Sequence, residues 1–273
     1  MKTLLLRLAG PMQSWGTQSQ FRERDTGLEP SKSGVIGLLC AALGRPRDEP
    51  VDDLAALVMG VRVEREGAMR RDYQTAGGWH RREDAWYGVA KADGKTGGTV
   101  LSDRYYLADA DFLVGLSGED EALLMRLHAA LGAPHWPLAL GRKAFVPAIP
   151  VQVPDNAAQY SPALRDGEVR TLLCDRDAVP WCAGRGGRDA APKQLRLVLD
   201  ATADDLTQAT GLIARRADVP VSFALGQRAF RTRFVRTDFT PRTLPSSLAS
   251  TSMSSSLLEG EADVPVVVAS EPA

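Results

Sequence analysis

Apolar residues in the first third of the chain follow strand-like patterns in some segments and a helix-like pattern in another. The run Thr3–Leu8 is apolar apart from one arginine and predicts a buried strand. The stretch Ser33–Gly44 is apolar on several sides and is bounded by serine and glycine, which predicts a tightly packed helix. Residues 60–65 alternate apolar and charged side chains, as a half-buried strand does. Because a Glu-Gly turn follows, we expect residues 69–75 to be the hairpin partner of that strand.

A second helix and further strands follow along the chain. Residues 100–107 and 111–116 are strand-like, and leucines between 123 and 131 recur at helical spacing until Gly132 ends the pattern. The order of elements resembles a β-α-β-β-α-β unit, with residues 138–146 as a candidate for its fourth strand. The patterning therefore predicts an α+β, ferredoxin-like domain over residues 1–147.

The helix and strand patterns fail in one internal stretch. Residues 76–98 carry glycine pairs at both ends, two tryptophans and mixed charges without a core-facing period, which indicates an insertion projecting from the fold. Its base extends to residue 104, so we assign 76–104 to the insertion.

The last part of the chain divides into a β-rich region and a tail. Residues 148–242 contain four strand-like segments, at 168–174, 194–199, 219–225 and 230–239. From residue 243 to 273 the chain is serine-rich and has no lysine, arginine or aromatic residue, which predicts disorder.

The loop between the first strand and the first helix is the best candidate for function. It contains more than twenty residues without helix or strand periodicity, and loops of that length are usually functional or disordered. Its amides, hydroxyls, cations and one aromatic ring suit an unpaired RNA strand, which needs stacking surfaces and phosphate contacts. The candidate side chains are Gln13, Ser14, Trp15, Gly16, Arg22, Arg24, Lys32 and Ser33. The alternative is a polar surface loop whose Trp15 packs on the core.

Composition and motifs narrow the possible chemistry. A formal net charge of −1, with 44% hydrophobic and 25% charged residues, argues against a non-specific nucleic-acid coat but allows a local basic patch. Three cysteines without ligand spacing indicate a reduced cytoplasmic protein with no structural metal. We also expect no signal peptide and no membrane span.

Catalytic motifs are weak. The segment before Ser33 lacks the second glycine of a phosphate-binding GxxxxGK[ST] loop, so ATP hydrolysis is disfavoured. Metal-independent RNA cleavage needs only an acid, a base and a cation, and spacing alone leaves His80, Tyr105 and Lys143 open for those roles.

Four stretches together resemble one known family. They are LLLRLAGPMQSWG, PSKSGVIGLLCAALG, RRDYQT and ALGRKAF, and they are similar to the CasD family of type I-E CRISPR Cascade complexes. The resemblance implies an RRM-like fold with a projecting thumb and a small β-rich C-terminal part. It also implies a non-catalytic subunit without cofactors that holds the 5′ handle of crRNA and caps the backbone filament.

The same resemblance implies partners and site residues. The partners would be crRNA, the backbone subunit and the large subunit, with target DNA reached only through the complex. Residues 13–16 with Lys32-Ser33 would cradle the handle, and residues 76–98 would form the thumb. The remaining candidate contacts are a basic pair and residues at the thumb base: Arg142, Lys143, Arg71, Tyr73, Arg104 and Tyr105.

Two other functions stay open at this stage. One is a metal-independent endoribonuclease acting on CRISPR repeat RNA, and the other is a protein–protein cap without an RNA role. Family likeness, which is an association and not a mechanism, separates these from the RNA-binding subunit.

Overall fold

A computed structural model gives the structure of residues 1–18, 22–77, 81–82, 85–86, 89, 99–153, 162–175, 192–208 and 211–241. Residues Met1–Pro241 belong to one compact unit. The predicted disordered tail, residues 243–273, and most of the predicted insertion lie outside the described residues, so both remain predictions.

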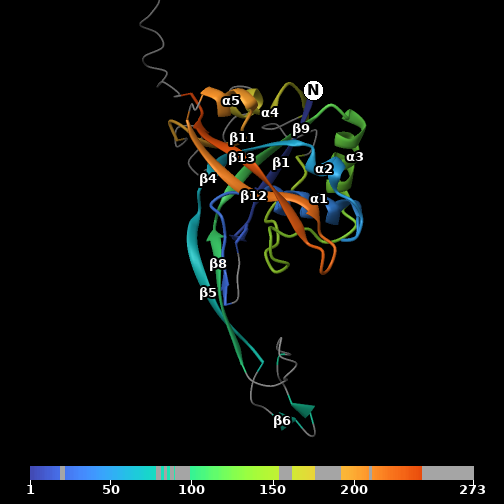
Figure 1. The fold of residues 1–273 in the computed structure, drawn as a ribbon, viewed down its shortest axis with the longest axis vertical. Helices are drawn as coiled ribbons and strands as arrows, with labels where there is room; N and C mark the ends of the chain where they lie inside the picture. Colours follow the sequence, from blue (N-terminus) through green and yellow to red (C-terminus); the bar gives the residue numbers. More distant parts are fainter. Residues whose placement is uncertain are drawn as a thin grey trace, which may run out of the picture. The chain divides into compact units, whose positions relative to one another are not determined.

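A seven-stranded antiparallel sheet runs through this unit (Figure 1). Its order is β10-β1-β9-β4-β11-β13-β12. The strands are β1 (Lys2–Ala9), β4 (Val58–Arg65), β9 (Asp111–Gly118), β10 (Leu164–Asp166), β11 (Arg196–Asp200), β12 (Leu212–Ser222) and β13 (Ala229–Phe239). Strands from both sides of residue 147 thus share one sheet.

The first four positions of the sheet form the predicted ferredoxin-like core. Helix α1 (Lys32–Leu43) connects β1 to β4, and helix α3 (Glu121–Gly132) follows β9. The β10-β1-β9-β4 order is that of a β-α-β-β-α-β unit in which the last strand pairs beside the first. The α+β, ferredoxin-like prediction is therefore confirmed.

The expected fourth strand was wrong, because residues 138–146 form a turn and β10 occupies that position. The Leu140 N–H donates to the Phe145 carbonyl at 2.7 Å, and the Phe145 N–H donates to the Arg142 carbonyl at 2.8 Å. Gly141 between them has a φ of 92°, which a regular strand does not contain.

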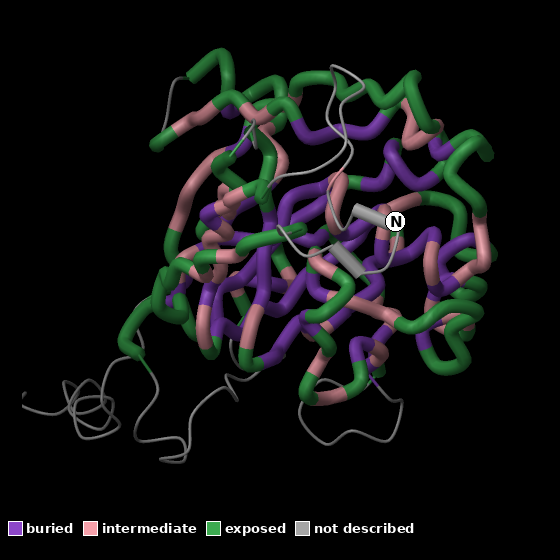
Figure 2. Tube along the Cα trace, turned by 90° about the horizontal axis from the view of Figure 1, so that it is seen from below, coloured by how far each residue is buried: buried purple, intermediate pink, exposed green. Residues whose placement is uncertain are grey.

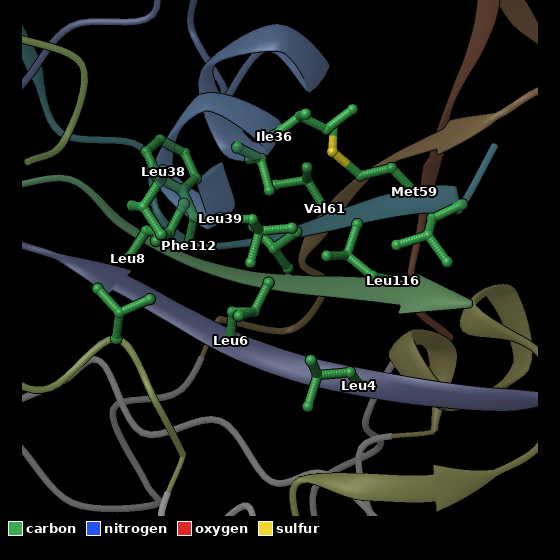
Figure 3. Packing of buried hydrophobic residues seen from close by; sticks show 14 of the residues in the cluster. Leu4, Leu6, Leu8, Ile36, Leu38, Leu39, Met59, Val61, Phe112 and Leu116 are labelled. Atoms are coloured by element: carbon green, nitrogen blue, oxygen red, sulfur yellow. The ribbon is translucent and has the colours of Figure 1, made fainter. Parts of the chain in front are cut away.

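Helices α1 and α3 pack against one another over the sheet. Figure 3 shows Ile36 and Leu39 of α1 close to Val61 of β4 and Phe112 of β9, all of them buried. Ser31 caps α1 through its hydroxyl, which accepts from the Gly34 N–H at 3.2 Å. The predicted glycine stop is also confirmed, since Gly44 is left-handed with a φ of 73°.

Helix α4 (Val169–Cys174) packs against β4 and β9. The strand predicted at residues 168–174 was wrong, because this segment is a helix whose Val169 and Leu173 share one face and are buried. They pack beside Gly60 and Gly115, which are paired across β4 and β9. Side chains at those two positions would collide with α4, so this close approach requires glycine.

A second sheet forms an arm. Strand β8 (Val100–Ala108) pairs along its length with β5 (Ala68–Ala76), and its other edge pairs with the short strands β2 (Met12–Gln13) and β3 (Glu23–Arg24). The strand at 69–75 was correctly predicted, but its partner is β8 and not β4. Beyond this arm, β6 (Arg81–Arg82) pairs with β7 (Ala85–Trp86).

Two short helices complete the elements, α2 (Asp52–Ala55) and α5 (Ala203–Gln208). Buried positions follow the central strands, while exposed positions dominate the connections around them (Figure 2). The loop between β1 and α1 is a partial exception, because several of its polar residues are buried.

Candidate nucleic-acid interface

Gln13 anchors the loop that follows β1. Its side chain is fully buried, and its Nε2 donates to the carbonyls of Leu8 at 3.0 Å and Ala110 at 2.8 Å. Its Oε1 accepts from the Trp15 indole Nε1 at 3.2 Å. Because both ends of the amide are occupied by the protein, Gln13 positions the loop and has no free group for a ligand.

Trp15 belongs to the core. The residue is 1% exposed, and its ring lies so close to Gly34 of α1 that a Cβ there would be 2.8 Å from a ring carbon. A base stacks on an aromatic ring only where the ring face is accessible. The burial of Trp15 therefore favours the alternative of a packed tryptophan over the predicted stacking role.

A basic pocket of about 450 Å³ lies between this loop, the start of α1 and the arm. Residues from the predicted set line it together with others that were not predicted. From the predicted set come Ser14, Trp15, Gly16, Arg24, Ser33, Arg104 and Arg142. The others are Asp25, Ser31, Gly34, Gly141 and Arg228. Below, "the basic pocket" means this set.

The pocket's walls approach each other closely where Gly141 meets the loop. A Cβ at Gly141 would overlap the carbonyl oxygen of Ser14, and the φ of Gly141 is 92°. The Ser14 N–H donates to the Leu140 carbonyl at 3.0 Å, and the Ser14 hydroxyl donates to the Tyr105 carbonyl at 3.3 Å. These bonds fasten the loop to the 138–146 turn and to β8, so the pocket is preformed.

The charge of the pocket is unbalanced. Its lining contains four arginines and, within the described part of the chain, a single carboxylate, Asp25. That carboxylate already accepts from the Thr17 N–H at 3.2 Å and the Gln18 N–H at 3.0 Å. The pocket is therefore electropositive and suited to an anion.

Arg142 is the clearest anion-binding candidate of the four arginines. Its Nη2 donates to the Arg24 carbonyl at 3.1 Å, and its guanidinium lies 5.5 Å from the centre of the Phe145 ring. Its Nη1 is buried and has no hydrogen-bond partner among the described residues. Burial, followed by the nearby charge of Arg104, lowers the pKa of Arg142 from its usual value. A bound anion would relieve both effects.

Lys32 has a structural role. It is 5% exposed, and its Nζ pairs with Asp200 of β11 at 3.3 Å. Its backbone N–H donates to Asp218 of β12 at 2.8 Å, and Arg233 of β13 bonds to both carboxylates. Burial lowers the pKa of Lys32, although Asp200 acts in the opposite direction. The Lys32 ammonium is therefore held in an internal ion cluster, which favours a structural role over the direct RNA contact predicted for it.

The arm separates the predicted residues at its base into two faces. Cross-strand pairs share a face, so Arg71 lies with Tyr105, while Arg104 lies with Asp72 on the opposite face. Arg104 and Arg24 line the basic pocket. Arg71 and Arg22 instead reach Asp103, at 3.7 Å and 3.1 Å.

The face away from the pocket is exposed. Tyr73 is 52% accessible, and the guanidinium of Arg22 lies 6.0 Å from the centre of its ring. Arg22, Arg71, Tyr73 and Tyr105 thus form a second surface, separate from the pocket. Tyr105 contributes its carbonyl, not its ring, to the pocket side.

Arg228 and Lys143 complete the placement of the cations. Arg228 comes from the turn between β12 and β13, and its only sequence signal was the excess of arginine after residue 215. Lys143 lines an adjoining groove and not the basic pocket. His80 lies outside the described residues, so a cleavage group made of His80, Tyr105 and Lys143 stays untested.

The described ranges contain neither a metal-ligating cluster nor a membrane-spanning helix. No group of three or more histidine, cysteine, aspartate or glutamate side chains there could hold a metal ion. No helix among them is long and apolar enough to cross a membrane.

The fold and the pocket define an α+β protein of the RRM-like, ferredoxin-like class with a preformed basic site. Comparison with known sequences then gives the family. Residues 3–236 match the family described as CRISPR-associated protein (Cas_Cas5), and the chain belongs to that family.

Individual relatives agree with this assignment. The chain is 37% identical over 157 residues to the CRISPR system Cascade subunit CasD of Escherichia coli (strain K12). That alignment covers 52% of this chain and 65% of the relative, just under two thirds of its length. The resemblance to CasD found in the sequence is thereby confirmed.

Two solved structures are similar over most of the chain. A chain of a CRISPR RNA-guided surveillance complex is 36% identical, with a TM-score of 0.70 and coverage of 90% of this chain and 92% of that one. A structure described as a Cas protein is 39% identical, with a TM-score of 0.61 and coverage of 89% and 100%.

Proposed function

We propose that this protein is a non-catalytic RNA-binding subunit of a type I-E CRISPR Cascade complex that holds the 5′ handle of crRNA. The observation that carries the proposal is the basic pocket, where four arginines converge from the loop after β1, the arm, the 138–146 turn and the β12–β13 turn. The one lining carboxylate already accepts bonds from the loop. An RNA phosphate supplies the missing negative charge, and hydroxyls of Ser31 and Ser33 suit nearby sugar or base groups.

The pocket's construction supports recognition of a strand end or a sharply bent single strand. A volume of about 450 Å³ is within the range of small-molecule sites and too small for a duplex. Guanidinium planes also stack on unpaired bases, which adds binding without sequence dependence. In this proposal the second surface, with Tyr73 and Arg71, contacts the RNA farther along.

The binding test uses purified protein and a labelled RNA with the repeat-derived handle sequence. Arg142→Ala should weaken binding about tenfold or more, since hydrogen bonds to charged groups contribute roughly 1.5–3 kcal/mol. The slope of log affinity against log salt should also become shallower by about 0.7, which corresponds to one lost phosphate contact on a single strand.

The matched control is Arg126→Ala, an exposed arginine on α3 that does not line the pocket. It should leave affinity and salt slope unchanged. Equal affinities for Arg142→Ala and the unaltered protein would remove the pocket from the proposal.

The proposed partners are crRNA, the backbone subunit and the large subunit, with target DNA reached through the complex. The subunit would cap one end of the backbone filament, in the cytoplasm. Support comes from the family and from the similar chain in an RNA-guided surveillance complex.

Cleavage of repeat RNA is the competing activity. Incubation of the protein with repeat RNA in the presence of chelator should give intact RNA. A specific cut that disappears in His80→Ala, Tyr105→Phe or Lys143→Ala would contradict the non-catalytic proposal, because those groups could supply the acid, base and cation.

A further inference from the structure

A groove of about 830 Å³ adjoins the basic pocket and has a different character. Helix α1 forms one wall through Leu38 and Ala41, and the 136–139 segment that follows α3 forms another. Phe223, which directly follows β12, also lines the groove. Most of the lining side chains are apolar, so the groove is suited to bury apolar groups.

Trp136 is an exposed aromatic side chain in this groove. Its side chain is 42% accessible, yet its backbone N–H is fixed to the Ala41 carbonyl at 3.1 Å. The neighbouring His135 N–H donates to the Ala42 carbonyl at 2.9 Å, and its ring packs edge-on against the indole at 5.1 Å. The tryptophan is thus held in place, and a held tryptophan on a surface is typical of protein–protein hot spots.

The rim of the groove is cationic. Arg45, Arg47, Lys143 and Arg228 line it, and its described lining contains no carboxylate. Arg45 is engaged by Asp53 at 2.6 Å and 2.8 Å. Among the described residues, neither Arg47 nor Lys143 forms an ion pair. A partner that fits this surface therefore combines apolar side chains with negative charge.

We propose that this groove docks a protein segment of a neighbouring subunit in the complex, in which apolar side chains are flanked by aspartate or glutamate. The apolar floor favours protein over RNA, because phosphates gain nothing from the leucine, proline and valine side chains that line it. The groove shares Ser33, Gly34, Gly141 and Arg228 with the basic pocket, so the docked segment lies beside the bound RNA. The inference uses the proposed place of the chain in a complex, but its test is separate from RNA binding.

The test places a photo-crosslinking amino acid at position 47 in the assembled complex, purified with its RNA. Crosslinks are expected to a peptide of another subunit that contains apolar residues beside Asp or Glu. Crosslinks to RNA, to a second copy of this chain or to its own residues 242–273 would each overturn the inference. So would the absence of any specific crosslink.

A substitution series gives an independent measurement. Arg47→Glu and Trp136→Ala should each lower incorporation of that neighbouring subunit about tenfold in native mass spectrometry, as substitutions at interface hot spots do. Binding of handle RNA to the isolated protein should stay within twofold. The matched controls are Arg126→Glu and Met125→Ala, both exposed on α3.

The outcomes separate the two proposals. Loss of RNA affinity in Arg47→Glu, with subunit incorporation retained, would assign the groove to RNA and overturn the docking inference. Unchanged incorporation in both groove variants would do the same. If pocket variants keep full RNA affinity while the groove variants lose the subunit, the RNA-binding proposal fails and the docking inference stands.

Discussion

At the scale of single residues, the polar side chains predicted to contact RNA divide between scaffold and site. The side chains of Gln13 and Lys32 form hydrogen bonds and ion pairs within the protein, whereas the guanidinium groups of Arg24 and Arg142 line the pocket. Sequence could identify the residue types, because RNA binding needs amides and cations. It could not say which of them the protein itself would satisfy, since their partners at Ala110 and Asp200 are remote in sequence.

The burial of Trp15 predicts a change in stability. Trp15→Ala should lower the free energy of unfolding by about 3–5 kcal/mol, as other buried Trp→Ala substitutions do, because the site cannot collapse around the missing ring. Denaturant unfolding measures the loss. Unchanged stability together with a large loss of RNA affinity would instead restore the stacking role.

At the scale of elements, long periodic segments were predictable and short ones were not. The strands β1, β4 and β9 and the helices α1 and α3 each bury several apolar residues, and that apolar pattern is visible in the sequence. The segment at 168–174 has too few residues to show a period. Its helix depends on the space beside Gly60 and Gly115, which only the folded sheet creates.

This space predicts a coupling between two residues. Gly115→Ala should cost about 1–3 kcal/mol, because the new methyl group overlaps the Val169 side chain. Val169→Ala should cost less in the Gly115→Ala background than alone, since it relieves the overlap. A double-mutant cycle in denaturant measures this coupling, and additive losses would contradict the proposed packing.

At the scale of the whole molecule, an ion cluster joins the start of α1 to three strands near the other end of the sequence. Asp200 and Asp218 receive Lys32 and Arg233, and Asp200 also accepts from the Met59 N–H at 2.9 Å. Lys32 cannot be paired with these two carboxylates from sequence, because more than a hundred residues separate them. The relation between distant segments is the part of the fold that patterning leaves open.

The cluster predicts a pH dependence of stability. Burial alone would raise the pKa of Asp218, but hydrogen bonds and charge from Arg233 lower it below its ordinary value of 3.8. A carboxyl whose pKa is lower in the folded state stabilises above its unfolded pKa, and this contribution is lost as pH falls through the folded value. Asp218→Asn should cost about 3 kcal/mol at pH 7, near the lower end for a broken buried pair because Asp200 still pairs with Arg233.

The difference in free energy of unfolding between the unaltered protein and Asp218→Asn should shrink as the pH is lowered below about 4. At that pH Asp218 loses its charge in the unaltered protein as well. Urea unfolding across this range measures it. A difference that stays constant down to acid pH would show that the charge of Asp218 is not what stabilises the cluster.

The placement of β10 has a consequence for dissecting the molecule. The three residues Leu164–Asp166 complete the ferredoxin-like unit beside β1, and they follow an apparently self-sufficient stretch of strands and helices. In a fragment ending at residue 147, the edge of β1 that pairs with β10 would have no partner strand. Lys32 would also lack the carboxylates that neutralise its charge. Residues before and after position 147 contribute strands to the same sheet, so we expect that neither part folds stably on its own.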